Sequence, residues 1–211
     1  YRTFLNDLAK YCRFRIVGMT ATPFRGNGVW LTDGREPLFT GIAHEVPMRL
    51  LLERGYLSPL VRPADVLQTI DTTGISTSAG DYNVAQLAER VDAYLAGVAT
   101  QAVRLASDRK KWIAFTPNVA TAHKLAGLLT DLGAPSEVVT GDTPKAEREA
   151  IISRFRDTND IRCLVTVLAL AVGFDVPEVD CIIWARPTKS PVLYVQGAGR
   201  GMRIAPGKTD C

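Results

Sequence analysis

The sequence predicts an α/β fold in which a parallel sheet is covered by helices on both faces. From residue 83 onward, apolar strand-like segments alternate with segments of helical periodicity, the pattern of consecutive βαβ units. The run at residues 112–115 is apolar throughout, as strands buried on both faces are. Several strand-like segments end in turns that contain threonine or glycine, a composition typical of the ligand-binding edge of such sheets.

The beginning of the chain carries short expected elements. Residues 4–11 place apolar side chains at helical spacing, and residues 14–19, which are mostly apolar, predict a strand. Pro23 has no N–H for a central ladder, so the chain should turn there. Thr20 and Thr22 lie between this strand and the turn. Their hydroxyl groups are suited to a ligand-binding edge, although an ordinary strand-to-loop passage has the same composition.

Three further segments complete the first third of the chain. Residues 47–55 predict a helix ended by glycine, and residues 60–70 predict a crossing strand. Residues 71–82 are rich in Thr, Ser and Gly, so we expect a flexible linker there. The chain is therefore divided into an initial part at residues 1–70, this linker, and a main domain at residues 83–211.

The main domain is expected to begin with a long helix capped by Asn83, because apolar residues keep helical register as far as residue 105. Further strands are expected at residues 112–115, 136–140, 162–167 and 180–184, and further helices at residues 118–132, from Thr143 onward, and from Ser190 onward. Right-handed crossovers place the carboxyl ends of all such strands on one edge of the sheet, where open α/β sheets bind ligands.

The last expected helix carries a polar stripe. Gln196, Arg200 and Arg203 lie at positions i, i+4 and i+7, so one amide and two guanidinium groups share a face. Arginine binds phosphate bidentately and keeps its charge, and such a pair can stabilise a transferring γ-phosphoryl group. The alternative is a solvated basic helix end that pairs with carboxylates.

The opposite side of this helix is expected to face the core. The residues at the matching positions are Val192, Val195, Gly199 and Met202. Three glycines in the same segment, Gly197, Gly199 and Gly201, are poor helix formers. They indicate that another group approaches the helix closely.

Four residues that follow expected strand ends are candidates for binding phosphate. These residues are Thr116, Thr140, Gly141 and Thr166. Hydroxyl groups and free backbone N–H groups at helix starts suit phosphate oxygens of a nucleic-acid backbone. Each threonine could instead be a simple cap, but their expected position on one sheet edge favours a shared ligand.

Several of these segments resemble the motifs of superfamily 2 helicases. Residues 196–203 read Q-G-A-G-R-G-M-R and resemble motif VI, Q-x-x-G-R-x-x-R. Residues 20–22 resemble motif III, residues 115–118 motif IV and residues 166–175 motif V. Residues 204–211 resemble the branch that contains RadD-like helicases and the motor subunits of type III restriction enzymes. The resemblance implies the second RecA-like lobe of a P-loop NTPase, preceded by the tail of a first RecA-like lobe.

The resemblance also implies roles for individual residues. The catalytic residues would be Arg200, Arg203 and Gln196, which act on the terminal phosphate of ATP. The nucleotide-binding residues would be Gly173, Asp175 and Gly199, with Asp175 accepting from a ribose hydroxyl or pairing with a motif VI arginine. The nucleic-acid contacts would be Thr116, Thr140, Gly141 and Thr166. The coupling residues between the nucleotide and the nucleic acid would be Thr20 and Thr22.

Composition narrows the possible classes. The net charge of +3 over 211 residues is too slight to indicate nucleic-acid binding by itself. Four cysteines without a C-x-x-C pair argue against a zinc site or a disulfide framework and for a cytoplasmic protein. We find no signal peptide and no apolar run near the roughly 20 residues of a membrane span, so no membrane partner is expected.

The sequence contains no G-x-x-x-x-G-K-[ST] and no Asp-Glu pair after a strand. The resemblance places both on the first lobe, so we expect this chain to be a fragment that is inactive as an ATPase, with ATP and Mg²⁺ bound mainly by the missing lobe. The favoured function is an ATP-dependent helicase or translocase, with DNA preferred over RNA. One alternative is a nucleic-acid-binding module without ATPase activity. A doubly wound metabolic enzyme is less well supported, because G-x-G-x-x-G is also absent.

Overall fold

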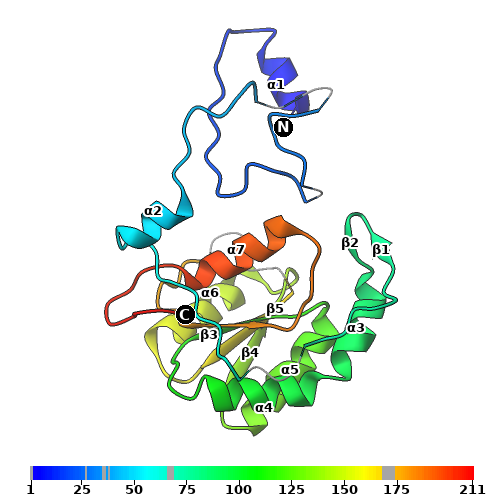
Figure 1. The fold of residues 1–211 in the computed structure, drawn as a ribbon, viewed down its shortest axis with the longest axis vertical. Helices are drawn as coiled ribbons and strands as arrows, with labels where there is room; N and C mark the ends of the chain where they lie inside the picture. The colour runs from blue at the N-terminus through cyan, green and yellow to red at the C-terminus, as the bar shows by residue number, and fades with distance from the viewer. Residues whose placement is uncertain (1, 27, 35–36, 38, 66–68, 168–173) are drawn as a thin grey trace.

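The computed structural model describes residues 2–26, 28–34, 37, 39–65, 69–167 and 174–211 (Figure 1). The main part is a four-stranded parallel sheet in the order β4-β5-β3-β6. Its strands are β3 (Trp112–Phe115), β4 (Ser136–Val139), β5 (Cys163–Thr166) and β6 (Cys181–Trp184). The helices of this part are α3 (Val84–Asp92), α4 (Leu95–Leu105), α5 (Val119–Asp131), α6 (Lys145–Asp157) and α7 (Pro191–Gly201). The predicted α/β class is confirmed.

The sheet has an apolar core on each face, because neighbouring strand residues point to opposite sides. Trp112 and Ala114 of β3 pack with α3, α4 and α5, whereas Ile113 and Phe115 pack with α6. The helix α7 lies on the same face as α6, where Gly197 meets Phe115 and Trp184 (Figure 1). The fold is therefore three layers, with the helix that carries the polar stripe packed directly on the edge strand β6.

The expected helix at residues 83–105 is two helices. Asn83 caps α3 as predicted, since its side chain accepts from the backbone N–H groups of Ala85 and Gln86. The helix ends at Asp92, and α4 begins at Leu95. The break lets both segments bury their apolar residues in the cluster that includes α5, which the continuous helical periodicity of the sequence did not reveal.

Two predictions of strands in the first part of the chain are wrong. Among the described residues, the structure has two short helices there, α1 (Arg2–Leu8) and α2 (Met48–Glu53), and an isolated antiparallel bridge between Phe24 and Trp30. Residues 14–19 form no strand, and the described residues of the segment 60–70 form none either. Val17 is 86% exposed and Met19 is 97% exposed. A strand needs a neighbour to pair its backbone groups. Among the described residues, none pairs with the backbone of residues 14–19, and Pro59 and Val61 pair only with Cys211.

The segment expected to be a flexible linker instead contains a hairpin. Strand β1 (Thr77–Ser78) pairs antiparallel with β2 (Asp81–Tyr82). Ala79 has φ 51 and Gly80 has φ 86, and a two-residue turn with positive φ at both positions matches the twist of a hairpin. The side chains of Ile75 and Tyr82 pack against the core next to α3. The segment is therefore attached to the main lobe, while the division of the chain into domains stays a prediction.

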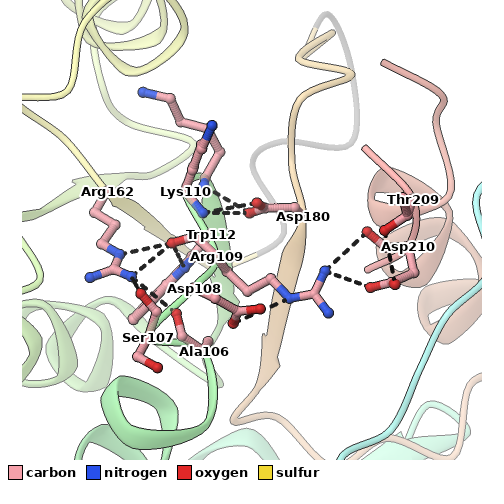
Figure 2. A network of polar contacts seen from close by, with 11 residues as sticks. Ala106, Ser107, Asp108, Arg109, Lys110, Trp112, Arg162, Asp180, Thr209 and Asp210 are labelled. Carbon is pink, nitrogen blue, oxygen red and sulfur yellow. Dashed lines mark hydrogen bonds and ion pairs between the residues drawn. The ribbon is translucent and has the colours of Figure 1, made fainter. Parts of the chain in front are cut away.

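The amino edge of the sheet is tied together by a polar network (Figure 2). The Arg162 guanidinium donates to the carbonyl oxygens of Ala106, Ser107 and Arg109 and lies 4.3 Å from the centre of the Trp112 ring. On the other side of β3, the Asp180 carboxylate accepts from the backbone N–H groups of Lys110 and Lys111. These contacts join the starts of β3, β5 and β6.

The end of the chain is held at the same edge. Asp210 forms an ion pair with Arg109, with Oδ1 2.5 Å from Nη1 (Figure 2). The backbone of Cys211 accepts from Val61 N–H and donates to Pro59 O. Residues 204–211 thus run from α7 to the amino edge of the sheet, alongside the segment that follows α2.

Candidate functional site

The helix α7 begins as the sequence predicts. Ser190 is its N-cap, with the Oγ atom accepting from Leu193 N–H, and Pro191 occupies the first helical position. Proline there loses no hydrogen bond, because the first N–H groups of a helix have no partner within it. The cap fixes where α7 begins, at the end of the loop that follows β6.

The buried side of α7 matches the expected one only in part, because Met202 is buried as expected but the other buried positions are Gly197, Ala198 and Gly201. A Cβ atom on Gly197 would lie 2.4 Å from the Trp184 ring, and one on Gly201 would lie 2.4 Å from Cys211 Sγ. A Cβ on Gly199 would meet no atom within 4 Å. The expectation that Gly199 faces the core is therefore wrong. Gly197 and Gly201 lie four residues apart and allow the close approach.

The two arginines of the polar stripe converge on one backbone acceptor. Arg200 Nη1 donates to the carbonyl oxygen of Phe174 at 2.7 Å, and Arg203 Nη1 donates to the same oxygen at 3.1 Å. Arg203 also pairs with Asp175, with Nη1 2.9 Å from Oδ1. Gln196 is exposed one turn earlier on α7. The structure thus brings Arg200, Arg203 and Asp175 together, as the pairing alternative for Asp175 anticipated.

The electrostatics of this cluster favour an anion. Burial lowers the pKa of Arg200, and the like charge of Arg203 lowers it further, while the Asp175 carboxylate opposes both effects. Arginine nevertheless stays protonated at neutral pH. Asp175 is 77% exposed and Arg203 is 33% exposed, so solvent and ligands can reach this ion pair. Among the described residues, the carboxylate of Asp175 is the acidic group that acts on both arginines.

Lys208 holds the end of the same helix, a role that the sequence analysis missed. Its ammonium group donates to Gly201 O and Arg203 O, each at 2.7 Å, and to Pro177 O at 3.2 Å. Burial is the main cause that lowers the pKa of Lys208. The last carbonyl groups of a helix lack partners within it, and a lysine shortly after the helix end is a recognised signal for such a cap.

The residues expected at the carboxyl edge of the sheet do lie on one edge. The parallel register pairs Phe115 with Thr166 and with Trp184, and Val139 with Thr166. The positions that follow these strands, including Thr116 and Thr140, are therefore adjacent. Thr116 N–H donates to Thr166 O at 2.9 Å.

The accessibility of these edge residues differs. The hydroxyl of Thr116 is fully buried and lies 3.3 Å from both Asn118 O and Thr166 O, and Thr166 is also fully buried. Gly141 is exposed. Arg148 Nη2 shapes its loop by donating to Thr140 O and Gly141 O, both at 3.1 Å. The structure thus leaves the backbone around Gly141 exposed, while the buried hydroxyl of Thr116 holds the edge in shape.

The two expected coupling residues contact each other. Thr22 N–H donates to Thr20 Oγ1 at 3.0 Å, and Thr22 is buried. A Cβ on Gly26, in the turn that follows, would lie 3.4 Å from Ser190 Oγ. The segment after Thr22 therefore approaches the start of α7. Gly173, expected to bind the nucleotide, lies outside the described residues.

Within the described part of the chain, no three His, Cys, Asp or Glu side chains gather in a way that could hold a metal ion. None of its helices combines the length and the apolar character needed to cross a bilayer.

The architecture and the site define a class: a RecA-like lobe with an arginine-bearing helix packed on its edge strand. A family model described as "Helicase conserved C-terminal domain" matches residues 95–205, more than half of the chain. The chain belongs to this family and is a superfamily 2 helicase C-terminal lobe.

Curated relatives extend this similarity. The chain is 28% identical over 200 residues to the "Putative mitochondrial ATP-dependent helicase irc3" of Schizosaccharomyces pombe, covering 94% of this chain and 32% of the relative. It is 28% identical over 193 residues to a "51.5 kDa protein" of a Lactococcus phage, covering 92% of this chain and 41% of that protein. The chain therefore spans less than half the length of these relatives.

One solved structure has a clearly similar fold. It is "The fragment structure of a putative HsdR subunit of a type I restriction enzyme from Vibrio vulnificus YJ016", with a TM-score of 0.56 and 22% sequence identity. The similarity covers 76% of this chain and 32% of that chain. At this level of identity it supports the fold alone.

Proposed function

We propose that this chain supplies the arginine-finger lobe of an ATP-dependent helicase or translocase that acts on DNA. The observation that carries the proposal is the convergence of Arg200 and Arg203 on Phe174 O, with Asp175 as the ion-pair partner of Arg203. This arrangement holds two guanidinium groups side by side in a partly solvated position. Such groups stabilise the charge that spreads over a phosphoryl group during its transfer.

In this proposal, the terminal phosphate of ATP replaces Phe174 O and Asp175 as the partner of the two arginines. Closure of a P-loop lobe on this lobe would bring the phosphate within reach, and Gln196 would act on the same group from one turn earlier. Gly173, Asp175 and Gly199 would border the nucleotide. The phosphate would readily displace the exposed carboxylate of Asp175 from Arg203, because an ion pair at the surface contributes little free energy.

Mg²⁺ does not fit the arginine stripe. This ion prefers carboxylate and water ligands, whereas the carboxylate found here, Asp175, pairs with Arg203. We therefore assign Mg²⁺ and most of the ATP binding to the P-loop lobe, and no step on this lobe involves the ion. In this proposal, the 211-residue chain alone would not hydrolyse ATP.

The nucleic acid would lie along the carboxyl edge of the sheet, beside Thr116, Thr140, Gly141 and Thr166. Gly141 would contact a backbone phosphate through its N–H group, since it is exposed. Contacts with phosphates do not depend on the base sequence. The buried threonine Thr116 would position the edge. Thr20 and Thr22 would couple this edge to the nucleotide, and the approach of the following Gly26 to Ser190 supports that route.

One comparison supports DNA as the substrate. The chain is 36% identical over 70 residues to the "Type I restriction enzyme EcoKI endonuclease subunit" of Escherichia coli. Other relatives are RNA helicases, such as "DEAD-box ATP-dependent RNA helicase 7" of rice, 30% identical over 134 residues. The choice between DNA and RNA therefore needs an experiment.

The test is ATP turnover by the protein that joins this chain to a P-loop lobe, with poly(dT), poly(U) or no nucleic acid. The proposal expects turnover to be stimulated more by poly(dT) than by poly(U), and expects none from the 211-residue chain alone. Binding of nucleic acid without any turnover would favour a binding module instead. Stronger stimulation by poly(U) would reject DNA as the preferred substrate.

A further inference from the structure

The β1–β2 hairpin is tied to the loop that leads into α7 by one carboxylate. Asp81 Oδ1 accepts from Lys189 N–H at 2.8 Å, and Asp81 Oδ2 accepts from the Thr188 hydroxyl at 2.8 Å. Arg186 Nη2 lies 3.6 Å from Oδ2. Three groups of the loop between β6 and α7 thus face a single side chain that precedes them by more than one hundred residues.

This carboxylate also sets the start of α7 through Thr188. The Thr188 hydroxyl has one hydrogen to donate, and it donates that hydrogen to Asp81. Its lone pairs are then turned toward Ser190 N–H, from which Oγ1 accepts at 3.0 Å. Ser190 in turn caps α7 through Leu193 N–H. An uninterrupted series of hydrogen bonds therefore runs from the hairpin to the first turn of the arginine-bearing helix.

The loop holds the hairpin in return. Lys189 Nζ donates to Thr77 Oγ1 at 2.8 Å and lies 4.8 Å from the centre of the Tyr82 ring. Contacts therefore run in both directions between β1–β2 and the loop. Figure 1 shows the hairpin beside the end of α7 at which the helix begins.

The negative charge of Asp81 is needed as the counter-charge of Arg186. The side chain of Arg186 is only 8% exposed, and its Nε atom is buried without a hydrogen-bond partner. A buried guanidinium without a counter-charge is strongly unfavourable. Burial raises the pKa of Asp81, but hydrogen bonds from Lys189 and Thr188 and the charge of Arg186 lower it by more, so the carboxylate is ionised at neutral pH.

We propose that Asp81 is a positioning residue for the arginine stripe: it fixes the start of α7 and joins that helix to the β1–β2 hairpin. The catalytic consequence rests on the proposed function, because it assumes that Arg200 and Arg203 act on ATP. Asp81 itself touches no reacting group. A movement of residues 71–82 would be transmitted to α7 by the contacts of this carboxylate.

The test compares Asp81→Asn with a matched control, Asp92→Asn. Asp92 also accepts from a threonine hydroxyl, that of Thr121, and pairs with a lysine, Lys124. It is 29% exposed, against 17% for Asp81, but it joins α3 to α5, away from α7. An asparagine offers one acceptor oxygen where Asp81 uses two. Asp81→Glu keeps the charge and serves as the rescue variant.

The first readout is amide hydrogen exchange of the 211-residue chain. We expect Asp81→Asn to speed exchange at Leu193 N–H about tenfold, with a smaller change for Asp81→Glu and none for Asp92→Asn beyond its effect on global unfolding. Equal exchange at Leu193 in both asparagine variants would overturn the proposal, because Asp81 would then not hold the helix start. This readout does not depend on ATP hydrolysis.

The second readout is ATP turnover by the protein that includes a P-loop lobe. Asp81→Asn should lower kcat about tenfold while KM for ATP and the affinity for poly(dT) change less than twofold, and Asp92→Asn should retain the wild-type kcat. Faster exchange at Leu193 with an unchanged kcat would reject the positioning role. A wild-type protein without turnover would instead refute the proposed function, leaving the exchange result to decide whether Asp81 fixes α7.

Discussion

Arg200 and Arg203 share one acceptor, the carbonyl oxygen of Phe174, at 2.7 and 3.1 Å. Two positive charges this close repel each other, so other contacts must keep the two guanidinium groups in place. The Asp175 carboxylate, the close packing of α7 on β6 and the cap from Lys208 hold them here. Each of these supports can be removed separately, which yields a set of predictions.

The glycines of α7 provide a matched pair. Gly197→Ala should destabilise the fold by about 1–3 kcal/mol, because the added methyl group would collide with the Trp184 ring. Gly199→Ala should stabilise it by up to about 1 kcal/mol, because alanine is the better helix former and no atom lies within 4 Å of the new Cβ. Urea denaturation measures both. A similar loss of stability in the two variants would contradict the packing of α7 on β6.

Removal of the Lys208 ammonium should loosen the end of α7. Lys208→Met keeps the length of the side chain but leaves three carbonyl groups without their donor, so we expect a loss of about 1–3 kcal/mol in the free energy of unfolding. The control is Lys145→Met on α6, whose ammonium is exposed and lies 3.8 Å from Glu149. Thermal unfolding of the two variants distinguishes them, and equal midpoints would argue against the cap.

Asp175 should matter for activity far more than for stability. Because the carboxylate is 77% exposed, Asp175→Asn should change the unfolding free energy by no more than about 1 kcal/mol. Loss of the carboxylate frees Arg203 from its ion pair, and ATP turnover should change without a change in the unfolding midpoint. A large fall in the midpoint would assign Asp175 a structural role instead.

The hairpin contact predicts a dependence of stability on pH. The pKa of Asp81 is lowered in the folded state, so its contribution is fully present above the unfolded pKa near 3.8 and is lost as the pH falls through the lower folded value. The difference in unfolding free energy between wild type and Asp81→Asn should therefore be large at pH 6 and shrink below pH 4. Urea titrations at a series of pH values measure it, and a difference that grows in acid would have the wrong sign.

Cysteine reactivity tests the burial of the sheet. Cys12 is exposed and Cys163 is fully buried. Burial raises the pKa of Cys181 to about 12 and that of Cys211 to about 11, and burial also raises the pKa of Cys163. Iodoacetamide at pH 8 should label Cys12 first, since the thiolate is the reactive form. Mass spectrometry identifies the labelled cysteines. Rapid labelling of Cys163 in the folded protein would contradict its burial in the core.

The main lobe was predictable because each of its elements carries its own signal. Caps at Asn83, Asn118 and Ser190 mark helix starts, and apolar runs such as residues 112–115 mark buried strands. The shared edge of the sheet followed from right-handed crossovers alone. These signals are local or depend on the handedness of the crossovers, so they can be read from the sequence without knowledge of tertiary contacts.

The missed features depend on contacts between distant residues. The sequence could not show that Asp81 meets Thr188, or that Gly197 rather than Gly199 meets Trp184. The apolar pattern of residues 14–19 predicted a strand, but a pattern does not supply the neighbour that a strand requires. The hairpin was not signalled either, because its turn holds Ala79 at φ 51, whereas two-residue hairpin turns favour Asn, Asp or Gly at that position.

The central claim is that the α7 arginines act on the terminal phosphate of ATP, and Arg203→Ala tests it most directly. In the protein that carries this chain with a P-loop lobe, nucleic-acid-stimulated ATP turnover should fall by ~10³ or more. The control is Arg156→Ala on α6, whose side chain is 47% exposed and pairs with its neighbour Asp157; its turnover should match wild type. A loss of less than tenfold for Arg203→Ala would contradict the arginine-finger role.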